Sequence, residues 1–585
     1  MRWIKPSLAV VATALLATSC SAGAGAGSGA AAGGPAAKDA SPLTAALGTE
    51  KESAGPAPAV PGARQGGTVN VYNTTDFRHL DPQKVYAGAT YNTSLLWGRQ
   101  LTQYQVVDGK ARLVGDLATD TGTSADGGRT WTYKLKEGLA WEDGQPITSQ
   151  QVRYGIERSF GKGYEVGPPY WPQWLTGEAS YEDARKKYSG PQDGDLAAIE
   201  TPDERTVVFH FPQPQADVPY MAAQSSSSPV RKDKDTGTDY DRLPFASGPY
   251  RIAEHVQNTR LVLERNPHWK AETDPIRNQY PEKFVFTFGK EALNLNQEIL
   301  SGRDGGADAT TVATQLSPEL YQTVDTDPKA KELVVSGRQG AFVTQLMINN
   351  ERVPDVAVRK ALHLAYPRQQ ARQVQGGTRI GELASTLSSP ALVDWQTYDL
   401  YPAKPEGDPE AAKQALAEAK QPPAGLTYAY ANTPTGQRVA QVLVEGFGKA
   451  GITIVPKPVD PKALLDEAHR ADSPYDLFEE TSSVDWPTPS TLIPFSFDGR
   501  ANSDLNAARY HNAEVDKEID RINQIGEPRQ KAKELYALEQ TVMKDLPVLP
   551  FAYPNMNQLR GSNIGGAFIH PIYGSVSLAW LYLKS

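Results

Sequence analysis

The chain has 585 residues, of which 39% are hydrophobic and 22% are charged, and its formal net charge at pH 7 is -9. This is the composition of a folded protein long enough for two or three domains. The negative charge argues against nucleic acid as a partner. Cys20 is the only cysteine, so an intrachain disulfide framework is excluded.

The first twenty residues have the layout of an export signal. Two basic residues precede a short apolar run over residues 8–17, and small residues follow before Cys20. That run is shorter than the roughly 20 apolar residues of a membrane-spanning helix. Residues 16–20, Leu-Ala-Thr-Ser-Cys, resemble the lipobox of bacterial lipoproteins, with Ala17 where leucine is usual. The resemblance implies that residues 1–19 are a signal peptide and that Cys20 is lipidated. The alternative is an ordinary secretory signal with an incidental cysteine.

Residues 20–65 are rich in Gly, Ala, Ser and Pro and have almost no large apolar side chains. Such a segment cannot bury enough surface to offset its ordering entropy, so we predict a disordered tether. From residue 66 the pattern becomes globular. We predict strands at 68–72, 131–135 and 206–211, and helices at 148–159, 356–365, 409–420, 436–450, 513–525 and 529–544. Because strands and helices are interleaved, the expected fold class is mixed α/β.

Four separated groups of motifs span residues 66–585. They are Gly66-Gly-Thr-Val-Asn70 with Leu80-Asp81-Pro82; Asp126-Gly-Gly-Arg-Thr-Trp131 with Asp143-Gly144; Ser247-Gly-Pro-Tyr250 with Arg265-Asn266-Pro267; and, in the second half, Asn349-Asn350, Asp485-Trp486 and Leu546-Pro547-Val-Leu-Pro550. In this order they resemble the extracellular solute-binding proteins of ABC importers, in the dipeptide and oligopeptide family (bacterial solute-binding family 5).

The resemblance implies a two-lobed periplasmic-binding-protein-like fold with an extra small domain inserted in the first lobe. We expect lobe I at residues 66–110, 231–335 and 556–585, the inserted domain at 111–230, and lobe II at 336–555. A peptide would lie extended between the lobes, with strand-like backbone hydrogen bonds. The implied partners are a peptide ligand and the permease subunits of an ABC transporter. We expect a monomer at the outer face of the cell membrane, held by its lipid anchor.

Asp485 matches the aspartate that receives the ligand's α-ammonium group in peptide-binding members of this family. A buried carboxylate is costly unless it is paired, so a cationic ligand terminus suits it. An Asx-type turn before Trp486 is the alternative. Ser482 stands where a tryptophan is usual, and Glu479 and Glu480 precede it. These glutamates would favour a basic peptide if they faced the cleft.

An aromatic cluster supplies further candidates for contact with the ligand. It comprises Tyr164, Tyr170, Trp171 and Trp174. Tyr170 matches best the tyrosine that related binders place over the ligand, while a local hydrophobic core is the alternative explanation. Trp486, beside Asp485, is a further candidate for the binding site. Weaker candidates are Tyr91, Asn92, Trp97, Asn349 and Asn350.

The sequence has no enzyme motif that we could find. The eight histidines show no metal-binding spacing, and no nucleophile elbow occurs. We therefore expect no catalytic residue, no metal and no cofactor. The expected function is a membrane-anchored lipoprotein that captures extracellular peptides for an ABC transporter. Two alternatives are the same fold with a metal chelate, sugar or signalling molecule as ligand, and a lipid-anchored hydrolase.

Overall fold

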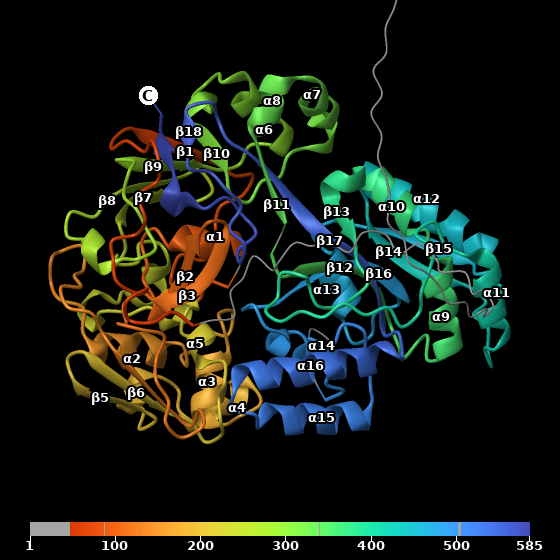
Figure 1. Ribbon diagram of the computed structural model, residues 1–585, viewed down its shortest axis with the longest axis horizontal. Coiled ribbons are helices and arrows are strands. Elements are labelled where there is room, and N and C mark those ends of the chain that lie inside the picture. Colours follow the sequence, from red (N-terminus) through yellow and green to blue (C-terminus); the bar gives the residue numbers. More distant parts are fainter. Residues whose placement is uncertain (1–46, 87, 339, 501–504, 585) are drawn as a thin grey trace, which may run out of the picture. The chain divides into compact units, whose positions relative to one another are not determined.

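The computed structural model describes residues 47–86, 88–338, 340–500 and 505–584 (Figure 1). Helices and strands alternate along this part of the chain, so the predicted mixed α/β class is confirmed. The expected signal peptide and Cys20 lie outside the described residues. None of the helices in these ranges is both long enough and apolar enough to cross a membrane.

One sheet has five strands in the order β10-β1-β9-β8-β7. The strands are β1 (Thr68–Tyr72), β7 (Tyr250–Val256), β8 (Arg260–Arg265), β9 (Lys283–Thr287) and β10 (Ala309–Thr311). β1 is parallel to both neighbours, and α6 (Ala292–Ser301) lies between β9 and β10 in the chain. The predicted strand at 68–72 is confirmed, and its Val69 and Val71 are fully buried.

A second sheet has seven strands in the order β11-β17-β12-β16-β14-β15, with β13 also on β17. They are β11 (Val334–Arg338), β12 (Phe342–Ile348), β13 (Gly381–Leu383), β14 (Leu426–Ala431), β15 (Ile454–Val459), β16 (Leu477–Ser483) and β17 (Val548–Leu559). β14 and β15 are parallel, and the chain passes between them through a helix, as parallel neighbours require.

The six predicted helices are confirmed, with ends that shift by a few residues. They are α2 (Ser149–Arg158), α9 (Val356–Ala365), α11 (Pro409–Ala417), α12 (Pro434–Lys449), α15 (Ala513–Asn523) and α16 (Pro528–Met543). Local caps explain where they begin: the Thr433 side chain accepts a hydrogen bond from the Gly436 N–H at 3.0 Å. α15 and α16 pack side by side (Figure 1).

A third, smaller sheet has the order β4-β6-β5, and β2 and β3 form a separate hairpin. Their bounds are β2 (Thr102–Val107), β3 (Lys110–Gly115), β4 (Thr130–Lys134), β5 (Ile199–Asp203) and β6 (Thr206–His210). Both remaining predicted strands are thus confirmed. Asp108 and Gly109 form the two-residue hairpin turn with φ values of 51° and 74°, which an Asp-Gly pair tolerates.

Short elements complete the described part of the chain. They are α1 (Gly88–Ser94), α3 (Tyr170–Thr176), α4 (Tyr181–Lys187), α5 (Val218–Met221), α7 (Tyr321–Thr326), α8 (Pro328–Glu332), α10 (Arg368–Gln375), α13 (Leu464–His469), α14 (Ile493–Phe497), β18 (Ile564–Gly565) and β19 (Tyr582–Leu583).

Residues 47–65 do not form the predicted disordered tether. The Gly48 N–H donates to the Leu113 carbonyl at 2.8 Å, and the buried Ser53 hydroxyl accepts from the Gly115 N–H at 2.8 Å. A Cβ on Gly55 would come within 2.5 Å of the Ala271 carbonyl oxygen. The prediction counted only apolar burial, whereas small residues let this backbone approach the domain and bond to it. It was wrong for residues 47–65, and residues 20–46 lie outside the described residues.

β11 and β17 run across two of the expected domain boundaries. The boundary at 335/336 falls inside β11, and the boundary at 555/556 falls inside β17. β17 pairs with β12 and β13 through residues 548–554 and with β11 through residues 555–559. Its end also reaches the five-stranded sheet, since the Thr310 hydroxyl donates to the Leu559 carbonyl at 2.9 Å.

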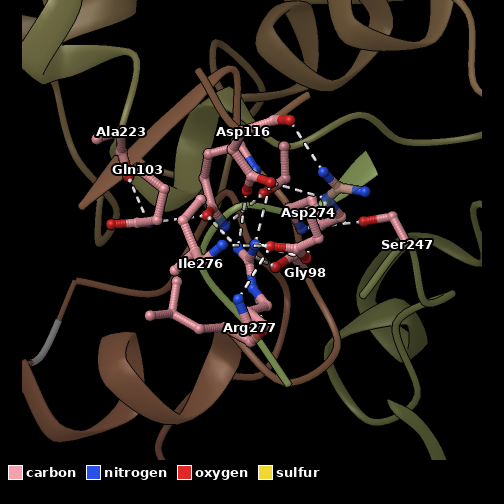
Figure 2. Close-up of polar contacts among 12 residues, drawn as sticks. Gly98, Gln103, Asp116, Ala223, Ser247, Asp274, Ile276 and Arg277 are labelled. Atoms are coloured by element: carbon pink, nitrogen blue, oxygen red, sulfur yellow. Dashed lines mark hydrogen bonds and ion pairs between the residues drawn. The ribbon is translucent and has the colours of Figure 1, made fainter. Parts of the chain in front are cut away.

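Four charged side chains form a buried network beside the β2–β3 hairpin (Figure 2). Asp116 accepts from Arg99 Nε at 2.8 Å and from Arg277 Nη2 at 2.8 Å, and Arg277 also pairs with Asp274 at 3.1 Å. At most 2% of any of these side chains is exposed. Burial alone would raise the pKa of Asp116, but the two guanidinium groups lower it to about 2.

Replacing Arg277 by Met should destabilise the fold strongly. The change leaves Asp116 and Asp274 buried with too little positive charge, which costs about 3–5 kcal/mol in the free energy of unfolding. Urea unfolding followed by circular dichroism measures this. The control is Arg251→Met, which breaks an exposed pair with Glu264 and should cost no more than about 1 kcal/mol. Equal unfolding midpoints for the two variants would contradict the prediction.

Candidate functional site

Asp485 follows β16 by two residues and meets side chains that come from distant parts of the chain. Its Oδ2 atom accepts a hydrogen bond from the Tyr86 hydroxyl at 2.8 Å and another from the Tyr170 hydroxyl. The backbone of Asp485 is held as well. Its carbonyl accepts from Gln224 Nε2 at 2.9 Å, and its N–H donates to Thr491 Oγ1 at 2.9 Å.

The Asp485 carboxylate has no positive partner among the described residues. Desolvation raises the pKa of this carboxyl, while the hydrogen bonds from Tyr170 and Tyr86 act in the opposite direction. Asp485 is nevertheless only half-buried, and within the described ranges its Oδ1 accepts no hydrogen bond. The carboxylate is therefore oriented through one oxygen, and its second oxygen is available to a cationic donor.

Aromatic rings pack behind this carboxylate. The ring of Trp486 lies 4.8 Å from that of Tyr170 and 5.9 Å from that of Trp174, measured between centroids. Trp486 is 1% exposed and its Nε1 donates to Ser490 Oγ at 2.9 Å. Tyr86, in contrast, is 42% exposed. Access to the carboxylate is therefore on the Tyr86 side, and Trp486 supports it from within the core.

The bonding of Asp485 differs from that of an Asx-type turn. Such a turn needs the carboxylate to accept from a backbone N–H two residues farther along. That residue is Pro487, which has no N–H to donate. The next N–H along the loop, that of Thr488, donates to the Trp486 carbonyl at 2.7 Å. The side chain of Asp485 bonds only to the two tyrosine hydroxyls among the residues that the structure describes.

Glu479 and Glu480 lie on opposite faces of β16, as neighbours in a strand do. Glu479 accepts from Gln375 Nε2 of α10 at 3.3 Å, and burial raises its pKa to about 7. Glu480 lies 3.1 Å from His469 Nε2 of α13. Each glutamate thus meets a helix packed on its own side of the sheet, and neither contacts Asp485 or its tyrosines.

Several other predicted site residues have their polar groups bonded within the protein. Trp171 is fully buried and donates to Ser227 Oγ at 3.0 Å. Asn92 donates to Ser575 Oγ at 2.7 Å, and the Tyr91 hydroxyl bonds to the Ala223 carbonyl. Tyr164 lies under the guanidinium of Arg158, 5.1 Å from ring centroid to Cζ. Trp97 is an exception: it is 1% exposed in the core of the five-stranded sheet, and its buried Nε1 has no hydrogen-bond partner among the described residues.

Asn349 and Asn350 lie at the far end of the strand pair from Asp485. Phe342 of β12 pairs with Ser483, two residues before Asp485, whereas Ile348 pairs with Leu477. Six residues of strand separate the two ends, which is about 20 Å. The Asn350 side chain donates to the carbonyls of Ala508 and Pro547 at 2.8 and 3.0 Å. The structure therefore brings Asp485, Trp486 and Tyr170 together and separates the two asparagines from them.

Sequence reasoning missed Tyr86 and Gln224. Both contact Asp485 across sequence separations of 399 and 261 residues. Neither residue belongs to a motif or to an amphipathic pattern. Only the three-dimensional arrangement reveals them.

Comparisons with known proteins identify the family. The family model for the bacterial extracellular solute-binding proteins, family 5 Middle, matches residues 112–504. The periplasmic oligopeptide-binding protein OppA of Salmonella typhimurium is 25% identical over 446 residues, which cover 73% of this chain and 76% of that protein. The "Probable deoxycholate-binding periplasmic protein YgiS" of Escherichia coli is 22% identical over 529 residues, covering 88% and 93%.

A solved structure agrees with this result. The structure titled clavulanic acid biosynthesis oligopeptide binding protein 2 superposes with a TM-score of 0.80 at 28% identity, covering 92% of this chain and all of that one. The predicted two-lobed, mixed α/β architecture is confirmed by this match. Since the family model covers more than half of the chain, this protein belongs to the bacterial extracellular solute-binding proteins of family 5.

Proposed function

We propose that this protein captures extracellular peptides, receives their N-terminal ammonium group on Asp485 and delivers them to an ABC transporter. Family membership supports the solute-binding role in an ABC importer, and the oligopeptide-binding relatives support peptides as the ligand class. The observation that carries the finer assignment is the Asp485 carboxylate, which two tyrosine hydroxyls orient and no described cation neutralises.

An α-ammonium group meets the chemical needs of this carboxylate. It brings a positive charge and three N–H donors. A hydrogen bond from an ammonium group to a carboxylate is charge-assisted and therefore strong. The two tyrosines are neutral donors, so they fix the carboxylate without cancelling its charge. A ligand cation would therefore replace water at Oδ1 while the bonds at Oδ2 stay in place.

The non-peptide alternative is less compatible with this site. One relative is named for deoxycholate, whose carboxylate is anionic. An anion placed at Asp485 would meet an unneutralised carboxylate of the same sign and be repelled. Among the ligand classes considered, the charge at Asp485 favours one with a cationic end.

We also propose that Cys20 is lipidated and anchors the protein to the outer face of the cell membrane. The lipobox-like sequence of residues 16–20 supports this proposal. The anchored protein would act as a monomer, with lobe I, the inserted domain and lobe II at the expected boundaries. β11 and β17 would then be the strands that cross between lobes I and II.

Asp485→Asn should weaken peptide binding by about 2–5 kcal/mol, because it keeps the shape of the side chain and removes the charge. The ligand is first identified by mass spectrometry of what co-purifies with the protein. Calorimetric titration then compares this peptide with its N-acetylated form. Acetylation of the peptide should reduce its binding free energy to the wild type by about as much as the Asp485→Asn substitution reduces the binding of the unmodified peptide.

The control for this experiment is Asp472→Asn, which removes a carboxylate that is 73% exposed and pairs with Arg470. Its affinity for the peptide should equal that of the wild type. If acetylation leaves the affinity of the wild type unchanged, Asp485 is not an ammonium receptor.

Asp485→Asn should also change how the stability of the ligand-free protein depends on pH. The folded carboxyl has a pKa above the ordinary 3.8, so it holds a proton that the unfolded chain has already lost. The free energy of unfolding therefore falls as pH rises through that window, and the Asn variant lacks this fall. Urea unfolding is measured at pH 3.5, 5 and 7 after ligand removal. The free energy of unfolding of the variant should rise relative to that of the wild type as the pH increases. A variant that is less stable at all three values would indicate a structural role.

Cys20→Ala should abolish membrane attachment and leave the fold intact. Without the thiol no lipid can be added, so the protein should either reach the medium or persist as an uncleaved precursor. Cell fractionation with immunoblotting distinguishes these states. A mature-size Cys20→Ala protein in the membrane fraction would contradict the lipoprotein assignment.

A further inference from the structure

A buried ion pair joins the first turn of α16 to the residue that precedes α5. Lys531 Nζ donates a hydrogen bond to Asp217 Oδ2 at 3.1 Å, and the two side chains are 8% and 2% exposed. Among the described residues, neither side chain forms another ion pair. Removal of either partner would leave the other as a buried charge without a counter-ion, which is unfavourable. The pair therefore fixes the position of α5 relative to α16.

Asp217 does not use its carboxylate to cap α5, although aspartate is a preferred capping residue at this position. Its backbone carbonyl accepts from the Tyr220 N–H at 3.0 Å, but its side chain makes no capping hydrogen bond. The carboxylate bonds instead to Lys531, which is 314 residues away in the sequence. A capping bond would stabilise only α5, whereas the observed bond connects α5 with α16.

Backbone hydrogen bonds lead from Asp217 through α5 to the loop that carries Asp485. The Met221 N–H donates to the Asp217 carbonyl at 2.9 Å, and the Gln224 N–H donates to the Met221 carbonyl at 2.9 Å. The Gln224 side chain then donates to the Asp485 carbonyl at 2.9 Å. The segment that begins at Asp217 thus holds the backbone of Asp485.

α16 holds the same loop from another direction. The Tyr536 hydroxyl donates to the Val393 carbonyl at 2.7 Å, and the Val393 N–H donates to the Pro487 carbonyl at 3.0 Å. Tyr536 lies in α16, five residues after Lys531. The loop is therefore supported at Asp485 through α5 and at Pro487 through α16, and the buried ion pair connects these two supports.

We propose that Lys531 and Asp217 are positioning residues for the Asp485 carboxylate. This role rests on the function proposed above, in which Asp485 receives the ammonium group of the ligand. A charge-assisted hydrogen bond is short and directional, so a shift of the loop by a fraction of an ångström weakens it. The ion pair keeps the loop in place through its two backbone supports, and the affinity for the ammonium group depends on it.

Hydrogen exchange of the ligand-free protein tests this role without a peptide. The variant is Lys531→Met, and the matched control is Lys533→Met, the same substitution at an exposed position of α16. Mass spectrometry should show exchange about 2- to 30-fold faster in residues 484–492 of Lys531→Met, the range for changes that act through a contact network. The control should exchange there like the wild type. Exchange in β1 and β9 should be the same in all three proteins.

Calorimetric titration with the co-purified peptide and its N-acetylated form tests the effect on Asp485 itself. Lys531→Met should bind the unmodified peptide about 2- to 30-fold more weakly and should bind the acetylated peptide about as well as the wild type does. A general loss of structure would lower both affinities equally. The ratio of the two affinities therefore separates positioning from a structural role. Lys531→Arg keeps the charge and should restore the wild-type ratio.

Asp217→Asn takes the place of Lys531→Met if that variant does not fold, because it removes the charge and keeps the shape of the side chain. It should change the exchange and the affinity ratio in the same direction. The proposal is overturned if residues 484–492 of the folded variant exchange as in the wild type, or if both peptides lose affinity equally. A wild type that binds both peptides equally well would instead overturn the ammonium-receptor function of Asp485. The exchange measurement would then still decide whether the ion pair positions the loop.

Discussion

The pairing of Arg277 and Arg99 with Asp116 is the interaction on which the first half of the structure depends. Arg277 also donates through Nε to the Leu95 carbonyl at 2.7 Å, so one guanidinium joins residues 95, 116 and 274. Such a network gains little net free energy, because every charge in it has lost its hydration. Its value is geometric: the partners must all be present in one arrangement. That arrangement fixes the segment that follows α1, and Tyr86 lies two residues before the first residue of α1, Gly88.

A second set of contacts connects α1 to Asp485. The Tyr91 hydroxyl bonds to the Ala223 carbonyl, and the next residue, Gln224, donates to the Asp485 backbone. Asp217 pairs at 3.1 Å with Lys531 of α16, with side-chain exposures of 2% and 8%. The candidate site is thus assembled by segments near residues 86, 170, 224 and 485, which are far apart in the sequence and pack into one hydrophobic cluster. Asp485 supplies the charge, and the other residues decide where that charge lies.

Local chemistry made much of the fold predictable. Thr433 caps α12, Asp355 caps α9, and alternation of Val69 and Val71 defines β1, so these elements can be read from a few neighbouring residues. Asp485 and Tyr170 could be selected as candidates because motif resemblance located them. Tyr86 and Gln224 could not, since their contacts lie hundreds of residues away. Residues 47–65 were mispredicted because backbone hydrogen bonds hold them in place. Amino-acid composition does not reveal such bonds.

β17 has a consequence for how the molecule comes apart. Its first seven residues bond to β12 and β13, its last five bond to β11, and its end contacts β10 of the other large sheet. One uninterrupted strand therefore takes part in both regions. If one end of β17 loses its backbone hydrogen bonds, the other end of the same strand is held less firmly against its own partners. The two regions share a cooperative unit, so neither can lose its structure as an independent module while the other stays fully native.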